Sequence, residues 1–273
     1  MTRIPPIAII IPHGGYAVPE ELAGIHALEP FDLFFEADSC ARDIFRLADG
    51  LCERFETDIS RVFMDVDRPP MDLPPRTADG VIKIETPTGR SVYPEGVFPD
   101  EIAIANMLRR YYFPFHTAIE KAVSSKRVRL ILDCHTMMPV GPEHSVDAGS
   151  PRPLFSVQNL SGGAGGGDRT APDRLAEALL ENLQKSFGAE TGTVAKRFTL
   201  NAPVFPTYTA GRYGTGRVPV LRLSVSRALF LTDRYFNYER MKVDAARLDA
   251  IRARLESAIT RFMEKNLQPG GKF

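Results

Sequence analysis

Short apolar runs of strand length, separated by helical patterns, constrain the fold of this chain more than any other feature. Residues Ile7–Ile11 form one uninterrupted run, and residues 128–132 and 154–158 are two further segments of strand length that are mostly apolar. Continuous runs of this length are typical of strands buried on both faces, as in a parallel sheet covered by helices. The chain is therefore expected to fold as an α/β domain, with a central sheet flanked by helices.

Helical patterns and further strands fill the spaces between these runs. Apolar residues recur at helical spacing over residues 38–55, where Asp38 is expected to cap the helix. The longest helix is expected to open at residues 99–101 and to run to about Ser125, with an interruption at Pro114. The remaining expected elements are strands at 59–66, 193–200 and 218–225, and helices at 171–187 and 238–265.

Three segments are expected to be loops. Residues 67–99 are rich in Pro, Gly, Thr and Asp, and a loop of that length in a compact domain is usually functional. Residues 161–168 are a Gly-rich connector, and residues 201–217 form a Gly/Tyr/Thr loop. We find no internal repeat and no linker, so residues 1–273 are predicted to form a single domain.

The composition excludes several classes of function. The 34 basic and 34 acidic residues balance, which leaves no electrostatic footprint for nucleic acid or for an anionic membrane. No apolar run approaches the roughly 18 residues that span a bilayer. The three cysteines (Cys40, Cys52 and Cys134) are odd in number and lack Cys-x-x-Cys spacing, which favours reduced thiols and a cytoplasmic protein. Cys40 and Cys52 are expected on one helix.

Two histidines are expected where buried strands end. His13 follows the first run and precedes Gly14 and Gly15, and His135 follows the run at 128–132. Ligands bind outside the carboxyl ends of strands in open α/β sheets. One histidine after a strand is more often structural, whereas two such histidines can share a metal ion. Asp133, two residues before His135, can accept a hydrogen bond from its ring and orient it.

The segment from Ser60 to Pro69 supplies two arginines, Arg61 and Arg68. Paired arginines suit capture of a carboxylate or stabilisation of an oxyanion, although a structural ion-pair network is the alternative. Other motifs are missing. The run of glycines at 162–167 lacks phosphate-loop spacing, and neither Ser145 nor Ser224 lies in a Gly-x-Ser-x-Gly motif. A nucleotide-binding protein or a serine hydrolase therefore has little support.

Six segments, in this order, resemble motifs of the N-formylglutamate amidohydrolase family, over most of the chain from Ile7 to about Leu231. They are Pro12-His13-Gly14-Gly15, Glu36-Ala37-Asp38, Ser60 to Pro69, Pro114-Phe115-His116, Asp133-Cys134-His135-Thr136, and the loop with Asn201-Ala202-Pro203 and Gly211-Arg212-Tyr213-Gly214. The family's third motif ends in Asn-Arg-Pro, and this chain has Asp67 in place of that Asn.

The resemblance implies a zinc-dependent hydrolase of a small N-acyl amino acid, such as N-formylglutamate, with a mixed sheet similar to that of zinc carboxypeptidases and aspartoacylases. The family pattern puts zinc on His13, His135 and Glu36, with Asp38 as the alternative carboxylate. The pattern also implies that Arg61 polarises the scissile carbonyl and that Arg68 binds the substrate carboxylate, with Asn201 and Tyr213 as further substrate-binding residues. Asp133 is implied as the outer partner of His135. His116 is either another outer partner or a histidine packed on a helix.

One departure affects the chemistry. The family's late strand carries a Glu that acts as the general base, and Ser224 stands at that position here. A hydroxyl is no base near neutral pH, and loss of a general base typically costs about 10²–10⁴ in rate. Either another carboxylate takes over, with Glu95 or Glu85 as candidates, or the chain is a binding or regulatory protein with little turnover.

Overall fold

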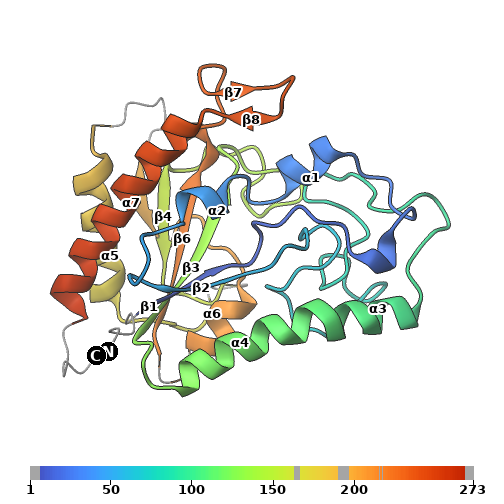
Figure 1. Ribbon diagram of the computed structural model, residues 1–273, viewed down its shortest axis with the longest axis horizontal. Helices are drawn as coiled ribbons and strands as arrows, with labels where there is room; N and C mark the ends of the chain where they lie inside the picture. The colour runs from blue at the N-terminus through green and yellow to red at the C-terminus, as the bar shows by residue number, and fades with distance from the viewer. Residues whose placement is uncertain (1–6, 163–166, 190–196, 215, 217, 268–273) are drawn as a thin grey trace.

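A mixed six-stranded sheet forms the centre of the computed structural model, which describes residues 7–162, 167–189, 197–214, 216 and 218–267 (Figure 1). The strand order is β2-β1-β3-β6-β4-β5. Strands β2, β1, β3 and β6 are parallel, β4 runs antiparallel to β6, and β5 is parallel to β4. The strand bounds are β1 Ile7–Ile11, β2 Glu53–Glu56, β3 Leu130–Met137, β4 Phe155–Gln158, β5 Phe198–Leu200 and β6 Val220–Ser226. The predicted α/β fold with a mixed central sheet is confirmed.

Helices and loops cover both faces of the sheet. The helices are α1 Pro30–Glu36, α2 Ala41–Ile44, α3 Glu101–Met107, α4 Phe113–Ser124, α5 Asp173–Phe187, α6 Tyr208–Gly214 and α7 Ala245–Asn266. Successive residues of β1 point to opposite faces, so Ile9 packs into the core under α2, α5 and α7, while Ile10 packs into the core under α4 and the long loop. Figure 1 shows α5 and α7 together on one face and α4 on the other.

The prediction of a helix over residues 38–55 and of a strand over 59–66 was wrong. Only Ala41–Ile44 is helical in the first segment, and Glu53–Glu56 is the edge strand β2. The apparent strand is a turn, in which the backbone N–H groups of Phe63 and Met64 both donate to Ser60 O. Its apolar residues are buried because the turn packs under the loop, whereas β2 is half exposed and charged and therefore lacks an apolar pattern.

The interruption of the long helix is confirmed. The side chain of Asp100 caps the amino end by accepting a hydrogen bond from Ala103 N at 2.7 Å. A π-helical turn, Leu108–Tyr112, then separates α3 from α4. It ends just before Phe113-Pro114, where the missing N–H of proline removes one helical hydrogen bond.

Other predicted elements need smaller corrections. The terminal helix starts at Ala245, after a hairpin of β7 Phe236–Asn237 and β8 Lys242–Val243. The predicted loop 201–217 contains α6. Three of the predicted segments lie partly outside the described residues: residues 163–166 of the glycine connector, 193–196 of the predicted strand 193–200, and 215 and 217 of the loop. Residues 67–99 form a folded loop, as predicted.

All three cysteines are free thiols, as expected, but Cys40 precedes α2 and Cys52 precedes β2, so they do not share a helix. Within the described ranges, none of the helices combines the length and the apolar character that crossing a bilayer requires.

The turn after β1 depends on a glycine. A Cβ atom added to Gly15 would lie 2.3 Å from the backbone oxygen of Asp58, which is far inside van der Waals contact. The neighbouring segment runs this close because Ala17 N donates to Asp58 O, and Ser60 N donates to Ala17 O. Gly15 therefore lets the segment that carries His13 pack against the segment that carries Arg61.

We expect Gly15→Ala to lower the free energy of unfolding by about 1–3 kcal/mol, because the backbone must move to relieve the contact. Gly211→Ala is the matched control, since its Cβ would lie 3.5 Å from the nearest atom, in helix α6, where alanine is neutral or stabilises by up to about 1 kcal/mol. Urea denaturation of both variants measures the difference. Equal effects would contradict the role of Gly15.

Candidate metal centre and cavity

The ends of two neighbouring strands bring His13 and His135 together. β1 pairs with β3 only from Ile7 to Ile10, opposite Leu130 to Asp133, and β3 then continues to Met137. The sequence had suggested that His135 follows the end of this strand. It lies within β3 instead, because pairing with β6 extends the strand to Met137. His13 follows the end of β1, and the two ring centroids lie 5.0 Å apart.

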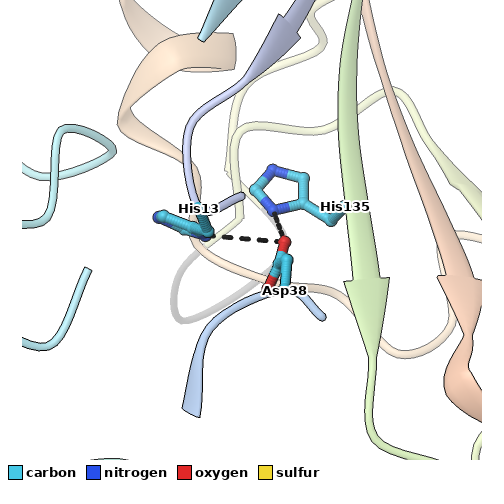
Figure 2. A group of neighbouring side chains, drawn as sticks. All are labelled: His13, Asp38 and His135. Carbon is cyan, nitrogen blue, oxygen red and sulfur yellow. Dashed lines mark hydrogen bonds and ion pairs between the residues drawn. The ribbon is translucent and has the colours of Figure 1, made fainter. Parts of the chain in front are cut away.

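Asp38 completes the cluster (Figure 2). Its backbone N–H donates to His13 O at 2.9 Å, which holds the segment after α1 against the end of β1. Its Oδ2 atom lies 2.8 Å from His135 Nδ1 and 3.8 Å from His13 Nδ1. All three side chains are buried. Within the described part of the chain, these three residues offer ligand atoms that lie within 4.8 Å of one another.

Buried carboxylates hold the outer nitrogen of each ring. His13 Nε2 lies 2.7 Å from Asp65 Oδ1, and His135 Nε2 lies 3.0 Å from Asp133 Oδ1. The contact between Asp133 and His135 is the one that their spacing predicted. Because Nε2 of His13 donates to Asp65, its Nδ1 carries a lone pair, and this buried atom has no hydrogen-bond partner.

The two imidazoles differ in charge. Burial and Arg61 lower the pKa of His13, although Asp65 and Asp38 act in the opposite direction, so the ring is neutral at pH 7. Burial and Arg222 act to lower the pKa of His135, but Asp133 and Asp38 outweigh them and raise it to about 9. His135 without a metal is therefore an imidazolium ion held between two carboxylates.

These donor atoms fit a zinc ion. Two imidazole nitrogens and one carboxylate form a common ligand set of catalytic zinc sites, and outer carboxylates that fix the rings are their usual companions. The unpartnered lone pair on His13 Nδ1 faces the same point as Asp38 Oδ2, as a shared cation would require. His135 Nδ1 lies 2.8 Å from the same oxygen, Asp38 Oδ2.

The geometry favours Asp38 over Glu36 as the carboxylate of this cluster. Glu36 lines the adjoining cavity, but its Oε1 atom accepts a hydrogen bond from Thr88 Oγ1, and its Oε2 atom is buried without a partner. The predicted capping role of Asp38 was wrong. Residue Cys40 occupies the N-cap position of α2, and the Asp38 carboxylate faces the imidazoles, with Arg61 Nη1 at 3.9 Å.

A chain of charges, buried at Asp65 and Lys83 and exposed at Asp79, connects His13 to Arg68. Asp65 Oδ2 lies 3.2 Å from Arg61 Nη2 and 3.2 Å from Lys83 Nζ. Lys83 is completely buried and also pairs with Asp79. The Asp79 carboxylate in turn lies 2.6 Å from Arg68 Nη2. The two predicted arginines and the predicted metal ligand thus belong to one network.

No role was predicted for Asp65, Lys83 or Arg222. Lys83 and Arg222 each interrupt an apolar run, Val81-Ile82-Lys83-Ile84 and Val220-Leu221-Arg222-Leu223. A charged residue in a buried run needs a partner, so these interruptions were the signal that could have revealed them.

A cavity of about 450 Å³ opens beside the cluster. Its lining includes five predicted site residues, His13, Glu36, Asp38, Arg61 and Arg68. Glu85, one of the two proposed replacement bases, also lines it, but the other, Glu95, is exposed and does not contribute to its lining.

Seven predicted site residues do not line the cavity: Asn201, Tyr213, His116, Ser224, Glu95, His135 and Asp133. The Asn201 amide pairs with Asn159, donating to its Oδ1 at 2.8 Å and accepting from its backbone N–H at 3.0 Å. Buried His116 donates from Nε2 to Val66 O at 2.9 Å and accepts at Nδ1 from the Tyr213 hydroxyl at 2.8 Å. His116 and Tyr213 therefore hold the segment that leads to Arg68. Ser224 is buried on β6, paired with His135 of β3.

Comparison with known proteins identifies the fold and the family of the chain. A crystal structure of N-formylglutamate amidohydrolase from Ralstonia eutropha JMP134 has a TM-score of 0.73 and 18% sequence identity, covering 96% of this chain and 97% of that one. The gene product Atu2144 from Agrobacterium tumefaciens has a TM-score of 0.64 and 15% identity, covering 97% and 92%. At such identities the similarity shows the fold. A comparison with curated proteins finds no match. The family model for N-formylglutamate amidohydrolase matches residues 5–231, and the chain therefore belongs to this amidohydrolase family.

Proposed function

We propose that this chain is a zinc-dependent hydrolase that cleaves the amide bond of a small N-acyl amino acid, such as N-formylglutamate. The single observation that carries the proposal is the buried, unpartnered Nδ1 atom of His13, which faces Asp38 and His135 at the edge of a cavity lined by arginines. When bound to His13, Asp38 and His135, zinc would supply a water activated as the nucleophile and polarise the acyl carbonyl.

The arginines bind and orient the substrate. Arg61 lies within 3.9 Å of the Asp38 carboxylate, lines the cavity, and has a buried Nε with no partner. It can donate to the carbonyl oxygen as negative charge develops there. Arg68 spends three of its N–H groups on Asp79 O, Asp79 Oδ2 and Asp67 O. Its two other N–H groups can donate to a substrate carboxylate.

Proton transfer needs a carboxylate other than residue 224. Glu36 and Glu85 line the cavity, and neither forms an ion pair with any described residue. One of these two groups accepts the proton of the attacking water in our account. Glu95 lies outside the lining and is not retained for this role.

A second candidate is a binding protein that has kept the cavity and lost turnover. Ser224, at the position of the family's general base, is the observation that favours it. Formate release from N-formylglutamate by zinc-loaded protein separates the two candidates. Sustained turnover supports the hydrolase, and stoichiometric ligand binding without turnover supports the binding protein.

We expect Asp38→Asn to weaken zinc binding by more than the roughly 10–100-fold that loss of an outer partner costs, because a direct ligand is removed. Glu36→Gln, two residues away, is the matched control and should change the affinity by less than about tenfold. Chelator competition measures both values, with His135→Ala as the reference for a lost ligand. If Glu36→Gln is the more damaging change, the ligand is Glu36.

Zinc affinity should rise with pH. The pKa of His135 is about 9 without metal, so the ring carries a proton at pH 7 that zinc must displace. The lowered pKa of His13 leaves that ring neutral in this range. The affinity should therefore rise about tenfold per pH unit between about pH 7 and pH 8.5, with one proton released per zinc, and level off above about pH 9. An affinity that does not change with pH would contradict the assigned charge of His135.

The proton acceptor can be identified by three isosteric changes. Glu85→Gln or Glu36→Gln should lower kcat by about 10²–10⁴-fold while the zinc content stays near that of the unmodified protein. Glu95→Gln, outside the cavity on the same loop as Glu85, should leave kcat unchanged. If all three variants turn over N-formylglutamate at the original rate, neither cavity carboxylate is the base.

A further inference from the structure

Arg227 is a buried arginine whose hydrogen bonds go to the chain segment just before Asp38. It follows β6 directly, is 5% exposed and contributes to the cavity lining. Its Nη1 donates to Phe35 O at 2.6 Å, and its Nη2 donates to Ala37 O. Its Nε is buried without a hydrogen-bond partner in the described part of the chain. Among the described residues, the guanidinium therefore forms its hydrogen bonds with this one segment.

The two carbonyls that it binds lie at the carboxyl end of α1, where a helix leaves oxygens without partners. The helix ends at Glu36, and the backbone is extended at Ala37, with a ψ of 173°. The two amino groups of a guanidinium are fixed in one plane, and here they reach one carbonyl on each side of Glu36. The helix dipole favours a positive charge at this end as well. Arg227 therefore fixes the direction in which the chain leaves α1.

The next residue is Asp38, and the two oxygens of its carboxylate face different partners. Oδ1 lies 3.8 Å from Arg227 Nη2 and 3.9 Å from Arg61 Nη1. Oδ2 lies 2.8 Å from His135 Nδ1 and 3.8 Å from His13 Nδ1 (Figure 2). The guanidinium groups attract one oxygen, so the other is left to the imidazoles.

The central sheet holds Arg227 in a fixed position relative to His135. Strand β6 pairs with β3, where Ser224 lies opposite His135 and three residues before Arg227. The backbone oxygen of Arg227 accepts a hydrogen bond from Phe230 N at 3.0 Å, which closes the turn after the strand. Asp38, by contrast, belongs to a segment outside the sheet. A guanidinium anchored on the sheet can therefore set the position of this carboxylate relative to an imidazole on the same sheet.

We propose that Arg227 is a positioning residue of the metal centre, which holds Asp38 with one carboxylate oxygen turned toward the two imidazoles. It acts through Asp38 and contacts neither the metal nor the substrate. The inference rests on the proposed function for the role of Asp38 as a metal ligand. It predicts that the effect of Arg227 on metal binding disappears when the carboxylate of Asp38 is removed.

A double-mutant cycle measures this coupling, with the zinc affinity from chelator competition as the readout. Arg227→Gln by itself should weaken zinc binding by about 10–100-fold, which is the cost of losing an outer partner. In a protein that already carries Asp38→Asn, the same change should cost no more than about twofold, because the ligand that Arg227 positions is already lost. An arginine that only stabilises the fold would weaken binding equally in both backgrounds.

Cobalt substitution gives a second readout that does not depend on turnover. The visible spectrum of bound Co²⁺ reports its ligands and geometry, so Arg227→Gln should shift the spectrum in the same direction as Asp38→Asn. Arg152→Gln is the matched control. Arg152 is 6% exposed and also lines the cavity, but its guanidinium forms two hydrogen bonds of 2.7 Å with Asp147 on its own loop. This change should leave both the spectrum and the zinc affinity unaltered.

Equal losses of affinity in the two backgrounds overturn the proposal, as does an Arg227→Gln protein that binds zinc like the unmodified one. Thermal unfolding identifies a variant that fails to fold. If Arg227→Gln is such a variant, the same cycle with Arg227→Lys, which keeps the charge and loses the planar fork, decides instead. A zinc affinity that Asp38→Asn leaves unchanged rejects the proposed metal centre, and the inference with it. A damaging Asp38→Asn with no coupling rejects only the role of Arg227.

Discussion

The hydrogen bond between His13 and the buried carboxylate of Asp65 is the interaction on which the rest of the site depends. It fixes the proton on the outer nitrogen of the ring and turns the lone pair of Nδ1 toward Asp38 and His135. Burial alone would raise the pKa of Asp65, but its interactions with His13, Lys83 and Arg61 outweigh burial and hold the pKa well below its usual value. Asp65 is thus ionised, as the outer partner of the proposed metal ligand His13 must be.

The same carboxylate couples the two halves of the cavity. One side of Asp65 holds His13, and the other side holds Lys83, which connects through Asp79 to Arg68. Buried ions are costly unless each has well-placed partners, and losing one partner leaves the others unpaired. The proposed metal-binding side and the proposed substrate-binding side therefore share one electrostatic network, which keeps the arginines at fixed positions relative to the imidazoles.

The parts of the fold that could be predicted from the sequence are the strands buried on both faces of the sheet, because such burial requires a continuous apolar run. The run Ile7–Ile11 and the Asp133-x-His135 spacing translated directly into a central strand and an oriented imidazole. The edge strand Glu53–Glu56 escaped because a half-exposed strand needs no apolar pattern. The partners of Asp38 and Arg222 could not be predicted either, since they come from segments that only the tertiary fold brings together, through contacts such as Asp38 N to His13 O.

The position of the metal itself tests this account most directly. An anomalous-scattering map, recorded at the zinc absorption edge on crystals grown with zinc, should show one peak about 2.0–2.2 Å from Nδ1 of His13, Nδ1 of His135 and a carboxylate oxygen of Asp38. The hydrogen bonds of both Nε2 atoms to Asp65 and Asp133 should persist in that crystal. The absence of a peak between the two imidazoles, or a peak on the Nε2 side of either ring, would contradict the central claim.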